Sequence, residues 1–429
     1  MTKTSRIRSP LDAASGPPHA SRAGRLIEFL GLRRSIVGLL TMVVLVGMGE
    51  HMAEQFLPLY LLSLGGGFLS VGFLNGMDNL LGALYSFPGG YLSDRLGTKR
   101  ALLVFNLVSM AGFLIVILVP SWPVVLAAAA LFLSWTAVSL PVTMSLVARV
   151  LPKNKRTMRM SVHSLVRRVP MALGPVAGGA FIAAWGVERG VRLAFVGALA
   201  MAAVAALVQQ LVIEDDPPRD GTKPAAEHNP LRLWKFMTGD LRNLLFSDIL
   251  VRFCEQIPYA FVVVWAVGTE QNPGPVTAVQ FGLLRSIEMA TAMLIYVPVA
   301  YLADRGRKKP FVVTTFVFFT LFPLVLYFSR SFWMLVAAFV LRGLKEFGEA
   351  TRKSLIMDLA PEDRKAGLFG LYYLIRDTIV SVAAFGGALL WSRSPALNLA
   401  AAFTFGSLGT LWFALRGKDL GAEHRTTAT

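Results

Sequence analysis

The 429-residue sequence predicts an all-α integral membrane protein made of two related halves with six helices each. Three observations predict this fold class. Hydrophobic residues make up 55% of the chain and charged residues only 16%, whereas a soluble protein carries about 25% charged residues. The hydrophobic residues form segments of about 20 residues or more, which is the length that crosses a bilayer. A motif in the first half also recurs in the second.

Twelve apolar segments are the predicted transmembrane helices, six in each half. They lie at residues 36–64, 69–93, 101–121, 123–150, 160–185, 191–213, 244–268, 275–302, 309–329, 331–359, 366–391 and 394–415. Polar loops rich in Gly, Pro, Lys or Arg separate most of these segments. This pattern predicts a helical bundle throughout.

The polar stretch between the sixth and seventh segments divides the chain. We predict a six-helix bundle at 35–213, a cytoplasmic linker at 214–243 and a second six-helix bundle at 244–415. Residues 1–34 are basic and contain Ser, Pro and Gly, so they are expected to form a disordered cytoplasmic tail. The apolar run that follows them is too long for the core of a cleaved signal peptide. Residues 416–429 are predicted to be a second cytoplasmic tail.

The repeated motif follows the second segment of each half. One copy reads Gly90-Tyr91-Leu92-Ser93-Asp94-Arg95-Leu96-Gly97-Thr98-Lys99-Arg100, and the other reads Ala300-Tyr301-Leu302-Ala303-Asp304-Arg305-Gly306-Arg307-Lys308-Lys309. The same offset of about 210 residues pairs Gly72 with Gly282 and Asp78 with Glu288, and an offset of about 209 pairs Arg167 with Arg376. These pairs indicate that one half is a copy of the other.

The net charge of +16 follows membrane topology and does not mark a nucleic-acid surface. Lys and Arg occur in the loops at 95–100, 153–159, 305–309 and 364–365, whereas the alternate loops at 65–68, 120–123 and 270–275 have none. Basic residues concentrate on the cytoplasmic side of membrane proteins. We therefore predict a multi-pass protein of the cell membrane with both termini in the cytoplasm, surrounded by lipid and without a nucleic-acid partner.

Motifs for catalysis, nucleotides and metals do not occur in the sequence. There is no Gly-x-x-x-x-Gly-Lys-Ser/Thr loop, no His-Glu-x-x-His helix and no Gly-x-Ser-x-Gly elbow. The only cysteine is Cys254, which excludes an internal disulfide and a metal site built from several thiolates. We expect a monomer that is not an enzyme and needs no cofactor and no metal ion.

Two predicted six-helix halves with a Gly-x-x-x-Asp-Arg-x-Gly-x-Lys-Arg loop resemble the major facilitator superfamily of secondary transporters. The resemblance covers residues 36–415. It implies two helical bundles that rock about a site near the middle of the bilayer, where a small-molecule substrate binds. The resemblance does not indicate which substrate that is.

In this family the loop motif is understood to latch the cytoplasmic gate when the protein opens outward. The positions that match here are Gly90, Asp94, Arg95, Gly97 and Lys99, with Asp304 and Arg305 in the second copy. The glycines permit a tight turn and close helix contact. The alternative interpretation is that the basic residues of the loop only set the topology.

The fifth segment contains a second family motif. Residues Pro170-Met171-Ala172-Leu173-Gly174-Pro175-Val176-Ala177-Gly178-Gly179 resemble the Gly-x-x-x-Gly-Pro-x-x-Gly-Gly motif of proton-coupled exporters, with Pro170 in place of its first glycine. We expect Gly174, Pro175, Gly178 and Gly179 to act in gating, and plain helix packing is the alternative. The exporter pattern also has an arginine in the fourth segment, where this chain has none and instead carries Arg342-Gly343 in the tenth segment.

Many ionisable residues fall at the predicted depth of the bilayer centre, where each would cost about 2.5–3.5 kcal/mol if it faced lipid. They must face a cavity or one another. The candidates for proton coupling are Glu50, His51, Glu54, Asp78 and Glu255. The candidates for lining the substrate cavity are Arg167, Arg285, Glu288, Arg342, Lys345, Glu346, Glu349, Arg376 and Asp377.

Two interpretations compete for these charges. Spacing along one helix predicts structural ion pairs between Arg342 and Glu346, between Lys345 and Glu349, and between Arg285 and Glu288. The carboxylates at positions 50, 54 and 78 have no basic partner within reach on their own helices. A carboxylate without a cation holds a proton more readily once it leaves water, which suits a site of proton coupling. His51 is either a proton relay or a hydrogen-bonded packing residue.

The sequence therefore predicts a transporter that moves a small organic solute by alternating access, with proton-coupled efflux as the first hypothesis. Proton-driven uptake of an organic anion is an alternative, because arginines bind carboxylates and phosphates bidentately. A transporter-like receptor or lipid flippase is a further alternative. The acidic residues of the first two segments and the arginines of the later ones leave the substrate charge open.

Overall fold

The fold is described from a computed structural model of the chain, which describes residues 34–133, 156–212, 230–269, 271–305, 307–361 and 365–419. Within these ranges the protein is helical, apart from one isolated bridge between Gly268 and Pro273. The predicted all-α class is confirmed. The N-terminal tail, the end of the fourth predicted segment, most of the linker and the last ten residues lie outside the described ranges.

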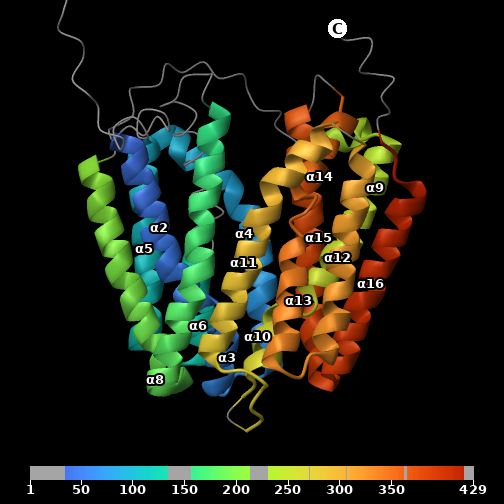
Figure 1. The fold of residues 1–429 in the computed structure, drawn as a ribbon. Coiled ribbons are helices and arrows are strands. Elements are labelled where there is room, and N and C mark those ends of the chain that lie inside the picture. Colours follow the sequence, from blue (N-terminus) through green and yellow to red (C-terminus); the bar gives the residue numbers. More distant parts are fainter. Residues whose placement is uncertain are drawn as a thin grey trace, which may run out of the picture.

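The helices form two halves that lie side by side (Figure 1). The first half contains α2 (Arg34–Glu54), α3 (Leu57–Ser63), α4 (Phe68–Leu96), α5 (Thr98–Leu118), α6 (Trp122–Phe132) and α8 (Arg156–Val212). The second contains η3 (Pro230–Phe236), α9 (Gly239–Gln256), η4 (Tyr259–Phe261), α10 (Val262–Val267), α11 (Ala278–Arg305), α12 (Lys308–Phe328), α13 (Phe332–Leu344), α14 (Glu349–Leu359), α15 (Lys365–Arg393) and α16 (Pro395–Arg416). In Figure 1, α2 begins and α16 ends at the same end of the bundle.

Helical elements occur within all twelve predicted segments. Seven of the described segments are long and apolar enough to cross a bilayer. The fifth and sixth predicted helices are one continuous element, α8, which bends at Gly186. Gly186 has φ 75°, a left-handed conformation that favours glycine. The predicted loop between these helices is thus a single-residue break.

Three segments predicted as continuous helices are broken, and the prediction was wrong there. The first segment divides between α2 and α3 just before Pro58, and the seventh divides at Pro258. The tenth divides at residues 345–348, where turns replace the regular helix between α13 and α14. Proline lacks the backbone donor that a continuous helix needs, which explains the first two breaks. In transporters such irregular backbone is found where it lines a cavity.

The beginning of the second half also differs from the predicted boundary. The helix η3 lies inside the segment that was predicted as linker, and α9 begins at Gly239, five residues before the predicted start at 244. Thr238 caps α9, since its side-chain oxygen accepts a hydrogen bond from the Leu241 backbone N–H at 3.2 Å.

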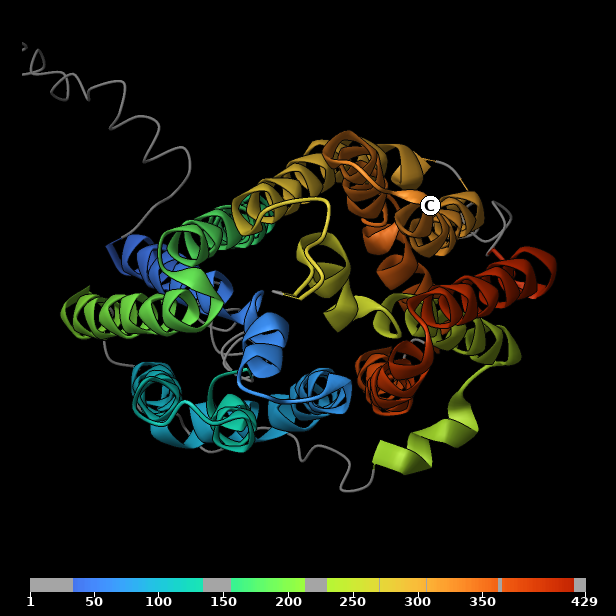
Figure 2. The same ribbon diagram turned by 90° about the horizontal axis from the view of Figure 1, so that it is seen from below.

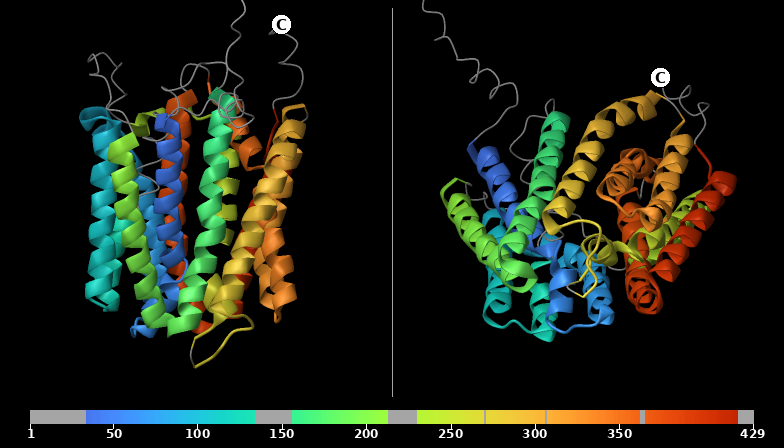
Figure 3. Two further views of the ribbon diagram at one scale, coloured as in Figure 1. Left: turned by 60° about the vertical axis from the view of Figure 1, so that its left-hand side comes forward. Right: turned by 60° about the horizontal axis from the view of Figure 1, so that its bottom comes forward.

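The two halves meet through paired glycines on equivalent helices. Gly72 on α4 packs against Ala388 on α15, and Gly282 on α11 packs against the Pro175 backbone on α8. Each glycine lies four residues after the start of its helix, so both contacts are at the same end of the bundle. Figure 2 shows α3 and α10 near the middle at this end, and Figure 3 shows α8 beside α11 from two sides. The duplication read from the sequence therefore corresponds to a pseudo-symmetric interface.

Candidate functional site

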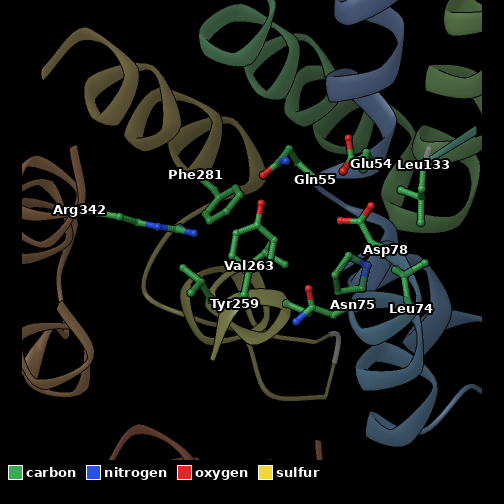
Figure 4. Close-up of a pocket in the computed structure, with 13 residues that line it drawn as sticks. Glu54, Gln55, Leu74, Asn75, Asp78, Leu133, Tyr259, Val263, Phe281 and Arg342 are labelled. Atoms are coloured by element: carbon green, nitrogen blue, oxygen red, sulfur yellow. The ribbon is translucent and has the colours of Figure 1, made fainter. Parts of the chain in front are cut away.

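A cavity lies between the two halves, next to the breaks in the first and seventh segments (Figure 4). Residues from α2, α3 and α4 and the residue that follows α6 line one side, and residues from η4, α10, α11 and α13 line the other. The lining residues are Glu54, Gln55, Pro58, Leu74, Asn75, Asp78, Leu133, Tyr259, Ala260, Val262, Val263, Phe281 and Arg342. Seven of them are apolar and six are polar or charged.

Two carboxylates form the acidic wall of this cavity. Glu54 is the last residue of α2, and Asp78 lies in the middle of α4. The Glu54 side chain is 22% exposed, and its Oε2 lies 3.4 Å from Nδ1 of His51 without forming a hydrogen bond. Asp78 makes no ion pair and no hydrogen bond with the part of the chain that the structure describes. The cavity is lined by both of these residues, which the sequence analysis grouped as candidates for proton coupling although they come from different helices.

Arg342 and Tyr259 form the opposite wall. The Arg342 side chain is 6% exposed, and its Nε lies 3.5 Å from Oε1 of Glu288. Its guanidinium lies 5.4 Å from the centre of the Tyr259 ring and 5.1 Å from that of Phe322. Figure 4 shows Arg342 reaching toward the cavity, with the Tyr259 hydroxyl between it and the two carboxylates. The cavity is therefore acidic on one side and basic on the other.

Two asparagines join the acidic wall to the break in the seventh segment. Asn75 Nδ2 donates to the Gln256 backbone carbonyl at 3.2 Å, and Asn79 Nδ2 donates to Gln256 Oε1 at 3.1 Å. The Gln256 carbonyl stands at the end of α9, where Pro258 prevents a regular helix from continuing. These hydrogen bonds attach α4 of one half to the interrupted backbone of the other.

An ion-pair network occupies the second half, behind the basic wall. Glu288 lies 2.5 Å from Arg285, 3.5 Å from Arg342 and 3.6 Å from Lys345, measured between the nearest charged atoms. Glu255 lies 2.8 Å from Lys345 and 2.7 Å from Arg252. Each of these carboxylates therefore has at least two cationic neighbours, which is what a buried charge requires.

The same network continues away from the cavity through Glu349 and Asp248. Glu349 lies 3.2 Å from Arg252 and 2.7 Å from Arg352. Asp248, 1% exposed, pairs with Arg352, accepts from the Tyr372 hydroxyl at 3.0 Å, and lies 3.4 Å from Arg376. Asp248 lies nine residues after the start of α9 and is buried.

Two of the three predicted ion pairs are wrong. Arg285 does pair with Glu288, but Arg342 pairs with Glu288 and not with Glu346, and Lys345 pairs with Glu255 and Glu288 and not with Glu349. The break at 345–348 removes the regular four-residue spacing on which those predictions depended. Glu346 instead lies 2.9 Å from Arg168 of the other half.

The remaining predicted site residues fall in several places. Glu50 is buried on α2, Arg167 lies half-buried on α8, and Asp377 lies 2.7 Å from Arg376 on α15. Glu255, a predicted coupling residue, is enclosed by cations. Sequence reasoning missed Tyr259, Asn75 and Arg168. Only Asn75 had a signal in the sequence, since it stands one helical turn before Asp78.

The glycines of the fifth segment mediate the closest helix contacts of the first half. A Cβ on Gly178 would lie 1.9 Å from the Met52 carbonyl oxygen, and one on Gly174 would lie 2.9 Å from the His51 Cβ. Gly179 meets the other half, since a Cβ there would lie 2.4 Å from the Ala278 carbonyl oxygen. These residues, with Pro175 against Gly282, form the packing surface between α2, α8 and α11.

The loop motif of the first half forms a tight turn. Gly97 connects α4 to α5 with φ 82°, a conformation that favours glycine, and Gln209 Nε2 donates to the Lys99 carbonyl at 2.7 Å. Gly90, Asp94 and Arg95 lie near the end of α4, and Asp304 and Arg305 end α11. The side chains of these residues lie outside the described part of the structure. In the second copy, Lys308 pairs with Asp358 of α14.

The family model of the Major Facilitator Superfamily matches residues 39–272 and 244–428, which together span nearly the whole chain. The chain belongs to the major facilitator superfamily. This superfamily member is thus a multi-pass membrane protein and a secondary transporter, as the resemblance implied. No curated protein matches its sequence.

Solved transporter structures share the fold of this superfamily member at low sequence identity. A mutant of the nucleoside transporter NupG has a TM-score of 0.76 at 12% identity, covering 89% of this chain and 99% of that one. The peptide transporter POT in complex with sulfate has a TM-score of 0.71 at 15% identity, covering 90% of this chain and 94% of that one. The human organic anion transporter MFSD10 (TETRAN) has a TM-score of 0.58 at 17% identity, covering 89% of this chain and 99% of that one. At these identities the likeness concerns the fold.

Proposed function

We propose that this chain is a proton-coupled transporter of the cell membrane, with both termini in the cytoplasm, that exports a small organic solute in exchange for protons. The solute binds in the cavity between the halves. Asp78, together with Glu54, takes up and releases the coupling proton. The observation that carries the proposal is the contrast between Asp78 and its counterpart in the second half.

The duplication allows Asp78 and its neighbours to be compared position by position with their counterparts in the second half. At an offset of 210 residues, Asp78 corresponds to Glu288 and Asn75 to Arg285, and at 209 Leu133 corresponds to Arg342. In the second half both cations lie against the carboxylate, at 2.5 and 3.5 Å. In the first half both positions carry neutral residues that line the cavity. The first half has the carboxylate at the equivalent position and neither of the two cations.

A carboxylate in this setting can carry a proton through a transport cycle. Removal from water without a cation favours its protonated form, and access of water or of a cationic group favours the ionised form. When the cavity opens to the cytoplasm, Asp78 releases its proton and solute binds. When it opens outward, protonation from outside displaces the solute. Rocking of the two halves alternates the access.

Proteoliposomes with opposite pH gradients test the coupling. Antiport predicts that solute accumulates in vesicles with an acidic lumen and that the luminal pH rises as protons leave. Symport predicts accumulation only when the outside is acidic. The sign of coupling does not depend on how the protein is oriented in the vesicle. Accumulation that is the same under both gradients would contradict proton coupling.

Neutralising variants assign the coupling residue. Asp78→Asn is expected to abolish gradient-driven accumulation, because the amide cannot take up or release the coupling proton and resembles the protonated side chain that displaces the solute. Glu54→Gln is expected to weaken coupling in the same assay. Glu188→Gln is the control, since Glu188 is an exposed carboxylate beside the bend of α8, away from the cavity. Unchanged coupling in both cavity variants would refute the assignment.

A second candidate function is proton-driven uptake of an organic anion. Among the described residues, the network of the second half holds seven cations against five carboxylates, counting Arg252, Arg285, Arg342, Lys345, Arg352, Lys353 and Arg376 with Asp248, Glu255, Glu288, Glu349 and Asp377. This excess of positive charge favours an anion at the basic wall. The same assay separates the candidates, because uptake by symport requires an acidic outside.

A further inference from the structure

We infer that the substrate is a zwitterion, an organic solute with an amine at one end and a carboxylate at the other. Its amine binds at Glu54 and Asp78, and its carboxylate binds at Arg342 and the Tyr259 hydroxyl. The inference rests on the proposed function, since it names the substrate of the same cavity. It follows from the opposite charges of the two walls.

The acidic wall has two carboxylates, and among the residues that the structure describes one titratable base, His51, lies within ion-pair distance of them. Oε2 of Glu54 is buried and has no hydrogen-bond partner, and Asp78 has neither an ion pair nor a hydrogen bond in the described part of the chain. Nδ1 of His51 lies 3.4 Å from Oε2 of Glu54, which is an ion pair when the imidazole is protonated. A primary amine supplies three donors and a positive charge, which matches Asp78 and the remaining acceptor capacity of Glu54.

The basic wall holds a guanidinium that its neighbours do not fully use. Arg285 is the closest cation to Glu288, at 2.5 Å, whereas Arg342 approaches it only through Nε at 3.5 Å. Lys345 is a third cation near the same carboxylate. Arg342 donates no hydrogen bond to the described part of the chain, and Figure 4 shows it extended toward the cavity. Its two terminal nitrogens suit a bidentate carboxylate.

The arrangement of the lining explains why one charge is not enough. Val263 and Phe281 belong to the half that carries Arg342, and Leu74 and Leu133 lie beside the carboxylates, on the side away from Arg342 (Figure 4). A singly charged solute would leave either the acidic side chains or the terminal nitrogens of Arg342 without a ligand, which is unfavourable for buried polar groups. A zwitterion neutralises both walls at once. Its amine also competes with the coupling proton for the same carboxylates, which makes the exchange of solute for proton obligatory.

A matched series of solutes tests the inference by equilibrium binding to the purified full-length protein. The probes are phenylalanine, phenylalanylalanine and phenylalanylalanylalanine, whose phenyl group suits the apolar lining and whose charges lie at increasing separations. Each is compared with its amide, which keeps only the amine, and with its N-acetyl derivative, which keeps only the carboxylate. We expect one length to bind roughly tenfold or more tighter than both of its derivatives. Equal binding of either derivative, or no binding of any zwitterion to folded protein, would overturn the inference.

Two variants locate the charges. Arg342→Gln is expected to weaken zwitterion binding roughly tenfold and to leave binding of the amide unchanged, whereas Asp78→Asn is expected to weaken both. Because Arg342 also neighbours Glu288, Arg342→Lys serves as a second variant that keeps the charge and loses the bidentate geometry. Arg330→Gln is the control, since Arg330 stacks on Trp265 outside the cavity. An Arg342→Gln protein that binds the zwitterion normally would refute the proposal that the substrate carboxylate binds at Arg342.

The binding experiment needs no gradient, so it separates the two proposals. Charge-selective binding of a zwitterion without proton movement would support the substrate class and reject proton coupling. Proton movement driven by singly charged solutes, with weaker binding of zwitterions, would support coupling and reject the substrate class.

Discussion

At the scale of single residues, the proposed function depends on which buried carboxylates have a cationic neighbour and which have none. Glu288 and Asp78 descend from one position in the duplicated unit, yet only Glu288 lies against basic side chains. A buried carboxylate between cations remains ionised and holds helices together. A buried carboxylate among neutral groups is free to exchange its proton. The residue type alone does not distinguish these roles.

Returning the missing cation to the first half should suppress coupling. Asn75→Arg places a guanidinium one helical turn before Asp78, as Arg285 stands before Glu288. We expect Asp78 to become a fixed ion and gradient-driven accumulation to fall about tenfold or more, as measured in proteoliposomes. Asn75→Leu is the matched control, because it removes the hydrogen bond to Gln256 without adding charge. Equal loss of coupling in both variants would show that the hydrogen bond, and not the charge, matters.

The sequence predicted the acidic wall better than the basic one. Glu54 and Asp78 were identified because no basic residue lay near them on their own helices, and this negative pattern does not depend on helix geometry. Tyr259 was missed because it lies in η4, after a proline break that hydropathy cannot reveal. Arg168 was missed because its partner belongs to the opposite half, and a contact of that kind leaves no spacing signal.

At the scale of helices, the packing depends on glycines that accept neighbouring backbone. Gly178→Ala would place a methyl group 1.9 Å from the Met52 carbonyl oxygen, so α2 and α8 would have to separate. We expect a loss of about 1–3 kcal/mol in stability, seen as a lower melting temperature in detergent. Gly82→Ala is the control, since a Cβ there would meet no atom within 4 Å. A Gly178→Ala protein as stable as the control would mean that the helices relax without strain.

Helix breaks limited what the sequence could predict about elements. Helical elements lie within each of the twelve predicted segments, because hydrophobic length is a strong signal, and seven of the described segments are long and apolar enough to cross a bilayer. The break between α13 and α14 was not predicted, since no proline marks it. That single error misplaced two ion pairs, because both assumed a continuous helix across residues 345–348.

At the scale of the whole molecule, one ion pair crosses between the halves beside the tenth segment. Arg168 lies 2.9 Å from Glu346, and both side chains are about one-fifth exposed. We expect Arg168→Gln to shift the balance between the two states of access, because the pair can form only while these helices are close. The charge swap Arg168→Glu with Glu346→Arg should restore it. Distances between spin labels on the two halves would measure the shift, and an unchanged distribution in Arg168→Gln would argue against a role in gating.

The linker between the halves should tolerate extra residues. We expect insertion of a short Gly-Ser segment within residues 214–229 to leave folding and transport unchanged, since it precedes η3 and the start of α9. The same insertion at 239–243, inside α9, should reduce the yield of folded protein. Size-exclusion profiles and transport rates would compare the two. Loss of folding from the first insertion would contradict the assignment of residues 214–229 to a linker between the halves.

The position of the only sulfhydryl group has a practical consequence for observing this transporter at work. Cys254 is fully buried, with its Sγ 3.3 Å from the Phe319 carbonyl oxygen and against Gly406. Maleimide and nitroxide reagents react with accessible thiolates, so they should leave the native chain unlabelled. Probes can therefore be attached at engineered surface cysteines without first removing a native one. One added cysteine in each half is therefore sufficient to attach the probes for single-molecule recordings of opening and closing.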